Sequence, residues 1–341
     1  MKQIFLFSCF AVLLAFLLPL LLYIPDRGIP EPGETAEQTQ IPAETPAPTS
    51  EAATAQPVRD ESILLSVLTD QGVEALSMSD YLRLALAGEM PASFEPEALK
   101  AQAVALRSYA LYYRAQRKSA HPEADVCTGS GCCAAAADPD ELRAAWGERY
   151  DEYARKLADA IRDTDGQYLT WEGAPALTVF HASSALRTES GAALGVDKRY
   201  LVSVDTPETE EDVRNLCSTV EVSAEEFAVS IRSVLPEADL SGPPERWTGP
   251  VRLDDAGRVS AVTIGGSELS GLALRQLFSL RSTDFTLLWE DGRFVFRVRG
   301  YGHGLGMSQY GAELMARDGA DYTAILRHYY PGTELVVAMQ N

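Results

Sequence analysis

The chain has 341 residues and carries 49 acidic side chains against 29 Lys and Arg, which gives a formal net charge of −20 at pH 7. Such an acidic chain repels nucleic-acid phosphates and anionic lipid headgroups, so the composition argues against a nucleic-acid partner and against adsorption to a charged membrane surface. Basic residues that face a groove then become candidates for binding a polar or acidic ligand.

The N-terminus carries an apolar run from Ile4 to Ile24, which matches the roughly 20 residues that cross a bilayer as a helix. Lys2 precedes the run, and no small-x-small cleavage site follows it, which favours an uncleaved signal anchor over 1–24 rather than a removed signal peptide. The positive-inside rule places Lys2 in the cytoplasm. We therefore expect a single-pass protein of the cell membrane whose remaining chain is extracytoplasmic.

Residues 25–60 are rich in Pro, Thr, Ala, Glu and Gln and contain few large apolar side chains. Such a segment cannot bury enough surface to offset the entropy cost of ordering, so we expect a disordered linker. Residues 61–341 are long enough for a substantial core, in one domain or in two closely packed lobes.

The segment 79–113 predicts two helices joined by a tight turn. Apolar residues recur at helical spacing before the turn. Gly88 stands where a C-cap glycine would, and Pro91 prevents the helix from continuing. Pro96 suits the first turn of the second helix. Glu89 is therefore expected on a short connection between two helices.

Glu89 has two interpretations. A solvated loop acid is the commonest fate of a glutamate. Alternatively, the Ala, Leu and Tyr side chains nearby provide apolar walls, and a half-buried carboxyl has a raised pKa, as a general acid needs. Lys100 and Arg107 lie seven residues apart on the second predicted helix, so they share a face and could line a groove nearby.

Four potential metal ligands fall within thirteen residues: His121, Cys127, Cys132 and Cys133. The spacing can enclose one tetrahedral zinc ion, and four protein ligands leave no open position for chemistry, so we interpret the site as structural. A zinc ion there would hold an insertion over residues 119–139 in place. A disulfide, with Cys217 pairing the remaining cysteine, and free thiols are the alternatives in an extracytoplasmic compartment.

The middle of the chain predicts regular structure with one polar segment. Residues 139–165 have the pattern of an acidic amphipathic helix or two, and 168–171 and 176–180 alternate like paired strands. The segment 181–189, which follows a strand, is dense in hydrogen-bond donors, although a lone histidine such as His181 is more often structural than catalytic. Residues 206–250 predict a short helical excursion without a site.

A glycine-rich segment, 300–311, is the second distinctive loop. Its glycine spacing matches neither nucleotide-binding fingerprint, and no lysine follows it. The glycines would let the backbone approach a ligand closely. Ser308 is placed to cap a helix, while Gln309 and Tyr310 offer hydrogen bonds and a stacking face. His303 could orient the acid, bind substrate or serve only as a structural hydrogen-bonding group.

Several blocks of the chain, in order and spread over residues 62–341, resemble the SpoIID/LytB family. The blocks are YLRLALAGEMPASFEPEALKAQAVALRSYAL, FHASSALRTES, LSGLALRQLFSLRSTDF, GYGHGLGMSQYGAELMARDG and ILRHYYPGTEL. The chain departs from the family at Ala185 and Leu186, where members usually have glycines. It also has Cys132 where some members place the second of two zinc-binding histidines.

The resemblance implies a peptidoglycan lytic transglycosylase that cleaves MurNAc–GlcNAc bonds, leaves 1,6-anhydro ends and uses Glu89 as its single acid and base. It implies a role in sporulation, in septal peptidoglycan thinning and engulfment, with a SpoIIP-type amidase and a SpoIIM-type membrane protein as partners. It also favours zinc at the His/Cys cluster. We expect an α+β fold, with mixed helices and antiparallel sheets around a substrate groove. The residues expected to bind glycan are Lys100, Arg107, His181, Ser183, Arg187, Thr188, His303, Ser308, Gln309 and Tyr310.

Two other functions remain open from the sequence. The first is a non-catalytic glycan-binding module that enhances a partner amidase, as some family members do. The second is a zinc hydrolase that uses His181, His303 and His328 with Glu89, although these histidines lack the short-range spacing of helix-borne zinc sites.

Overall fold

The computed structural model describes residues 57–129 and 131–339. The expected anchor over 4–24 and almost all of the expected linker lie outside these described residues. None of the helices within them is both long and apolar enough to span a membrane.

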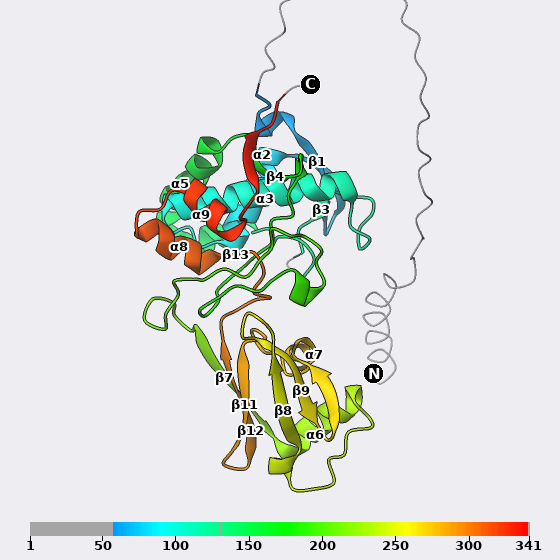
Figure 1. Cartoon of the computed structure of the whole chain (residues 1–341). Helices are drawn as coiled ribbons and strands as arrows, with labels where there is room; N and C mark the ends of the chain where they lie inside the picture. The colour runs from blue at the N-terminus through cyan, green and yellow to red at the C-terminus, as the bar shows by residue number, and fades with distance from the viewer. Residues whose placement is uncertain (1–56, 130, 340–341) are drawn as a thin grey trace, which may run out of the picture. The chain divides into compact units, whose positions relative to one another are not determined.

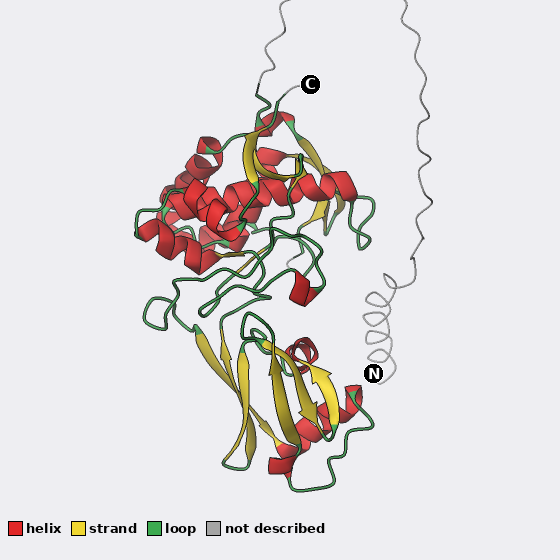
Figure 2. Cartoon of the chain, in the orientation of Figure 1, coloured by secondary structure: helices red, strands yellow, loops and turns green. Residues whose placement is uncertain are grey.

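The described residues combine helices with several small sheets, which confirms the α+β class (Figures 1 and 2). The helices are α2 Met78–Glu89, α3 Pro96–Gln116, α4 Pro139–Trp146, α5 Tyr150–Asp163, α6 Ala224–Val234, α7 Gly271–Leu277, α8 Gln309–Arg317 and α9 Tyr322–Tyr329. The strands are β1 Leu64–Thr69, β2 Gly72–Ser77, β3 Val126–Cys127, β4 Gln167–Trp171, β5 Ala174–Pro175, β6 Phe180–His181, β7 Cys217–Ser223, β8 Thr248–Leu253, β9 Val259–Ile264, β10 Ser267–Ser270, β11 Phe285–Glu290, β12 Arg293–Arg299, β13 Met307–Ser308 and β14 Glu334–Val337.

Helix α3 is the centre of the first hydrophobic core (Figure 1). It begins at Pro96, as predicted, and most of its first four turns is buried on every side. A helix that is apolar all round needs neighbours all round. Its many alanines let α2, α5, α8, α9 and β4 pack closely against it.

The second hydrophobic core lies between residues 222 and 298 and is built on two antiparallel sheets, in the orders β11-β12-β7 and β10-β9-β8. Aromatic rings fill it, and the rings of Phe227 and Phe294 stack with centroids 3.8 Å apart. Helix α6 begins with a capping box formed by Ser223 and Glu226. The predicted short helical excursion over 206–250 is therefore incomplete, because this segment also supplies strands β7 and β8.

A short parallel pair joins the two polar segments on either side of the second core. Strand β6 pairs with β13, so that His181 lies opposite Ser308. Isolated bridges extend the junction, between Ser183 and Tyr301 and between Glu189 and Leu305. The fold thus brings together two segments that are more than a hundred residues apart in sequence.

Candidate active site

Glu89 is the last residue of α2 and is half-buried. Its Oε1 accepts a hydrogen bond of 2.5 Å from the backbone N–H of Ala135. The preceding residue, Gly88, is helical rather than the left-handed C-cap that the sequence predicted. Its importance is steric, because a Cβ there would lie 2.4 Å from the carbonyl oxygen of Ala135. Gly88 thus lets the 135–137 segment approach α2 and reach Glu89.

Burial raises the pKa of Glu89 above its ordinary value, while the Ala135 N–H and the side-chain amide of Gln309 act in the opposite direction. The Gln309 amide lies close enough to influence the carboxyl, although its Nε2 makes no hydrogen bond of normal geometry. A half-buried carboxyl with a raised pKa and few donors is the kind of group that can donate a proton near neutral pH.

Ser308 and Gln309 connect the glycine-rich segment to Glu89. Ser308 caps α8, as predicted, and accepts a hydrogen bond from the N–H of Gly311. Gln309 is the first residue of α8 and is almost completely buried. The next residue, Tyr310, packs edge-on against Phe94 in the connection after α2, with centroids 5.0 Å apart. The start of α8 therefore lies against the connection that follows Glu89.

His181 and His303 lie close together, with ring centroids 5.8 Å apart. Nδ1 of His181 contacts the carbonyl of Leu305 at 3.2 Å, and its Nε2 contacts Oγ of Ser184 at 2.6 Å. The tautomer that satisfies both contacts donates from Nδ1 and accepts the Ser184 hydroxyl at Nε2. Burial, followed by the nearby His303 and Arg258, holds the pKa of His181 well below its usual range. Burial and the nearby Arg275 lower the pKa of His303 to about 4, so both rings are neutral at pH 7.

The remaining residues of the 181–189 segment differ in exposure. Arg187 is exposed, and it contacts Ser203 and Asp205. Ser183 and Thr188 are buried; the backbone of Ser183 pairs with that of Tyr301, and the hydroxyl of Thr188 accepts a hydrogen bond from the N–H of Val204. Of these predicted glycan-binding residues, Arg187 alone presents its side chain to solvent.

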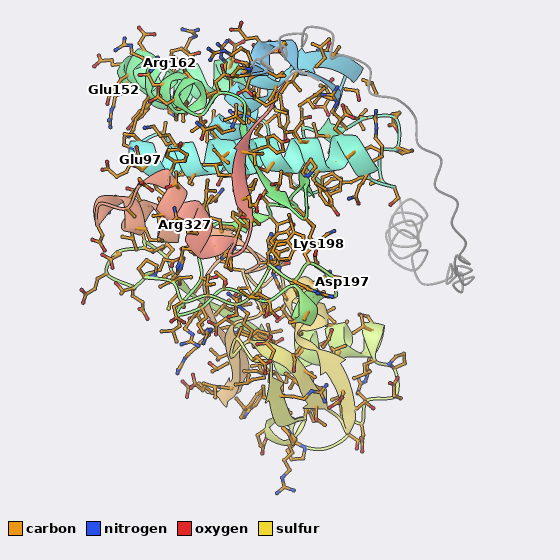
Figure 3. The ribbon with its side chains drawn as sticks, turned by 45° about the horizontal axis from the view of Figure 1, so that its top comes forward. Glu97, Glu152, Arg162, Asp197, Lys198 and Arg327 are labelled. Atoms are coloured by element: carbon orange, nitrogen blue, oxygen red, sulfur yellow. The ribbon has the colours of Figure 1, made fainter. Side chains whose placement is uncertain are left out.

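Lys100 and Arg107 both form ion pairs with carboxylates that the sequence did not predict. Arg107 is fully buried and forms a bidentate pair with Asp60, with Nη2 and Oδ2 2.6 Å apart. Lys100 is paired with Glu97, which Figure 3 labels on α3, and with Asp163. Both cations thus already have carboxylate partners. We leave Arg107 out of the proposed glycan-binding set, because no atom of its side chain reaches the surface.

The His/Cys cluster is assembled as the sequence predicted. One donor atom from each of His121, Cys127, Cys132 and Cys133 lies within 4.8 Å of the others. The four cysteines of the described residues are free, so the predicted disulfide alternative is not formed here. Tetrahedral zinc with sulfur at about 2.3 Å needs donors separated by roughly 3.5–4 Å, so the cluster fits zinc with small movements.

Without a metal, the thiols of the cluster hold their protons. Burial, and then the nearby Cys133, raises the pKa of Cys132 to about 12, and burial raises the pKa of Cys133 as well. Zinc binds thiolates, so a bound metal would have to displace these protons. Within the described residues, this is the one group of three or more His, Cys, Asp or Glu residues placed to hold a metal. The predicted alternative of a zinc hydrolase built on Glu89 and the other three histidines is therefore not assembled, and His328 instead contacts the carbonyl of Asp205.

Sequence reasoning missed two buried charged residues near the junction. Glu208 lies in the segment for which no site was predicted, and its Oε1 accepts a hydrogen bond from the N–H of Ser184 and one from the hydroxyl of Ser308. Arg258 enters from the loop between β8 and β9, and its Nη2 donates to Oγ of Ser184 at 2.8 Å. No local pattern in the sequence distinguishes Glu208, because it is one acid among many in an acidic segment.

Comparison with known proteins places the chain in a family. Residues 69–171, which include Glu89 and the His/Cys cluster, match the SpoIID family, described as stage II sporulation protein. Stage II sporulation protein D of Bacillus subtilis (strain 168) is 30% identical over 337 residues, which cover 98% of this chain and 96% of that protein. The chain therefore belongs to the SpoIID family.

Two further relatives show how far the similarity extends. Stage II sporulation protein D of Bacillus amyloliquefaciens is 30% identical over 341 residues, covering 97% of this chain and 95% of that protein. The amidase enhancer of Bacillus subtilis (strain 168) is 31% identical over 153 residues, which cover 45% of this chain and 21% of that protein.

Proposed function

We propose that this protein is a peptidoglycan lytic transglycosylase that uses Glu89 as its single acid and base. The observation that carries the proposal is the environment of Glu89. Its carboxyl is half-buried, its pKa is raised by burial, and it lies against the start of the glycine-rich segment's helix. Family membership supplies the substrate class, the glycan strands of peptidoglycan.

The chemistry requires only one carboxyl. Most glycosidases need two, one to protonate the leaving oxygen and one to act as nucleophile or to activate water. In a lytic transglycosylase the C6 hydroxyl of MurNAc attacks instead. Protonated Glu89 donates its proton to the glycosidic oxygen as the bond between MurNAc C1 and that oxygen breaks. The resulting carboxylate then accepts the proton of the C6 hydroxyl as the 1,6-anhydro bond forms, which restores the protonated acid.

The surrounding residues supply positioning for this reaction. The Ala135 N–H fixes one carboxyl oxygen, and the Gln309 amide is available to the other oxygen or to the sugar. Tyr310, Arg187 and His303 retain solvent-exposed surface and remain our candidates for glycan contact. The buried residues Ser183, Thr188 and Ser308 would act by holding the backbone in place.

Glu89→Gln in the full chain tests the proposal. The substrate is glycan strands stripped of peptide, and the product is detected by mass spectrometry as 1,6-anhydro ends. Loss of a general acid costs about 10²- to 10⁴-fold in rate. Glu123→Gln, at an exposed acid beside the His/Cys cluster, is the matched control and should retain full activity. Full activity of Glu89→Gln would refute the assignment.

A second candidate function is a non-catalytic enhancer of a partner amidase. The observation that favours it is the similarity to the amidase enhancer of Bacillus subtilis. A pure enhancer would bind stripped strands and stimulate an amidase while releasing no anhydro ends, and Glu89→Gln would leave that stimulation unchanged. The two functions can coexist in one chain, and the same variant separates them.

The cellular setting is part of the proposal. We propose that the protein acts in sporulation, in septal peptidoglycan thinning and engulfment, beside a SpoIIP-type amidase and a SpoIIM-type membrane protein. We further propose that 1–24 anchors it in the cell membrane and that its catalytic domain is extracytoplasmic. At the His/Cys cluster, His121, Cys127, Cys132 and Cys133 would hold a structural zinc ion and so fix the loop that carries Ala135.

A further inference from the structure

Glu208 is a buried acid at the junction of the two polar segments. Its exposed fraction is 5%, although it lies in an acidic stretch of the chain where most acids face solvent. Burying a carboxyl is costly unless its oxygens are hydrogen-bonded. The contacts of Glu208 therefore indicate what the fold gains from this residue.

Oε1 of Glu208 joins two segments that are distant in sequence. It accepts a hydrogen bond of 3.0 Å from the backbone N–H of Ser184 and another from the hydroxyl of Ser308. Ser184 belongs to the 181–189 segment, and Ser308 belongs to the glycine-rich segment. A single oxygen thus ties together the two loops that β6 and β13 bring side by side.

The other carboxyl oxygen faces helices α8 and α9. Oε2 of Glu208 and the hydroxyl of Tyr329 are both buried without a hydrogen-bond partner of normal geometry. A Cβ on Gly311 would lie 2.1 Å from the Tyr329 hydroxyl and 2.9 Å from this oxygen. The glycine on α8 thus makes room for both groups. Burial, and then the charge of Glu208, raises the pKa of Tyr329 well above its ordinary value.

Ser308 carries the effect of Glu208 toward Glu89. The hydroxyl of Ser308 donates to Glu208, and the same oxygen accepts the N–H of Gly311 to cap α8. An N-cap side chain holds the first turn of a helix in place by accepting one of its free backbone N–H groups. The first residue of α8 is Gln309, which is buried, and Tyr310 after it packs edge-on against Phe94 in the connection that follows Glu89. The side-chain amide of Gln309 also acts to lower the pKa of the Glu89 carboxyl.

We propose that Glu208 is a positioning residue for the acid–base reaction: by holding the Ser308 cap and the Ser184 backbone, it places the Gln309 amide against Glu89. This inference rests on the proposed function only for its kinetic readout. Glu208 does not touch the reacting atoms and acts through Ser308 and Gln309.

The groups that face Glu89 define what a change at Glu208 can alter. On its own helix, Tyr81 is the titratable neighbour, and its phenol is buried and neutral. The 135–137 segment contributes the N–H of Ala135, and α8 contributes the Gln309 amide. Of these, the amide alone depends on the Ser308 cap. Because that amide lowers the pKa of Glu89, its displacement should raise this pKa further.

The test compares Glu208→Ala, Ser308→Ala, Gln309→Leu and the double variant Glu208→Ala/Gln309→Leu in the full chain. The kcat/KM for release of anhydro ends is measured against pH, and its alkaline limb reports deprotonation of the general acid. We expect all four variants to shift that limb to higher pH. We expect kcat to fall by about 10- to 100-fold, as for misplacement by about 1 Å, with KM changing less. The double variant should match Gln309→Leu alone, because both changes act through one amide.

Glu211→Gln, at an exposed acid in the same loop, is the matched control and should behave as wild type. If Glu208→Ala fails to fold, Ser308→Ala, which removes both the bond to Glu208 and the side-chain cap of α8, carries the comparison. The proposal is overturned if Ser308→Ala or Glu208→Ala leaves the alkaline limb in place, or if the effects of Glu208→Ala and Gln309→Leu are additive. Either result would make Glu208 a purely structural residue.

A readout without catalysis separates this inference from the proposed function. In a chain labelled with ¹³C at glutamate carboxyls, the Glu89 signal is the one that disappears in Glu89→Gln. Its titration should move to higher pH in Ser308→Ala and Glu208→Ala, whether or not the wild type cleaves glycan. If the wild type does not cleave glycan and the Glu89 titration does not move in the variants, both proposals are rejected. If the wild type does not cleave glycan but the Glu89 titration does move, only the enzymatic proposal is rejected.

Discussion

The backbone N–H of Ala135 donates a hydrogen bond of 2.5 Å to Oε1 of Glu89. Ala135 follows Cys133 by two residues, so the loop that carries the His/Cys cluster also supplies the donor that holds the candidate acid. A hydrogen bond to a carboxylate favours its charged form. The distance between the loop and α2 therefore influences both the position and the pKa of Glu89, and the first two predictions alter that distance.

Gly88→Ala should reduce activity and stability together. The helix-forming preference of alanine over glycine would favour the variant by about 1 kcal/mol. The new Cβ would, however, lie 2.4 Å from the backbone oxygen of Ala135, which cannot rotate away. Overpacking of this kind costs about 1–3 kcal/mol, so the clash should outweigh the propensity. Urea unfolding and anhydro-end release measure the two effects.

Gly242→Ala is the control for this experiment, because an added Cβ there meets no atom within 4 Å. It should leave both activity and unfolding unchanged. A Gly88→Ala protein that is as active and as stable as wild type would show that the 135–137 segment does not need to lie so close to α2.

Removal of metal should loosen the same loop. We expect one zinc ion per chain by elemental analysis, and we expect Cys133→Ser or strong chelation to remove it. Structural zinc sites contribute folding energy directly. A loss of about 3 kcal/mol corresponds to a fall of roughly 10 °C in Tm for a domain of this size. Cys217→Ser, at an exposed cysteine outside the cluster, should change neither zinc content nor Tm. Equal Tm values with and without chelator would exclude a structural metal.

Arg107→Met should destabilise the fold without changing glycan binding. The side chain is fully buried against Asp60, and removal of one partner of a buried pair costs about 3–5 kcal/mol because the other charge is left uncompensated. Co-sedimentation of the protein with glycan strands stripped of peptide should show that the folded fraction binds with unchanged affinity. Arg162→Met on α5 (Figure 3) removes an exposed pair with Asp159 and should leave the free energy of unfolding near that of wild type. A loss of affinity without a loss of stability would restore Arg107 to the glycan-binding set.

Local patterns in the sequence predicted the elements but not their contacts. The Pro96 start of α3 and the Ser308 cap of α8 both follow from residues within one turn of the element they begin. The His/Cys cluster was also predictable, because its four ligands fall within one loop. These features depend on short-range chemistry that a sequence displays directly.

The features that could not be predicted depend on long-range packing. Gly88 stands where a C-cap glycine would, yet a glycine is needed there because the backbone of Ala135, 47 residues later, packs against it. Arg107 has the position of a groove cation, yet Asp60, 47 residues earlier, buries it. Glu208 bonds to Ser308, 100 residues away. In each case the partner decides the role of the residue, and no periodicity in the sequence identifies the partner.

Glu189 should make the stability of the fold depend on pH. Burial, followed by the neighbouring carboxyl of Asp254, raises its pKa from 4.5 to about 7, against the opposing N–H of Ser190 and the charge of Arg258. The unfolded chain thus loses its proton first as pH rises. The stabilising contribution of the protonated folded form is complete below about pH 4.5 and is lost between there and about pH 7.

Glu189→Gln tests this assignment, because an amide keeps the shape of the protonated acid and does not titrate. Urea unfolding at pH 5 and at pH 8 should show the wild type losing stability relative to Glu189→Gln as pH rises across this window. The variant should therefore gain an advantage at pH 8 that it lacks at pH 5. Glu334→Gln, at an exposed acid on β14, controls for the general effect of charge and should follow the wild type at both pH values. The difference in free energy of unfolding between wild type and Glu189→Gln could instead be the same at pH 5 and pH 8. Glu189 would then titrate alike in the folded and unfolded chains, and the charge of Arg258 would fully offset the cost of burying the carboxylate.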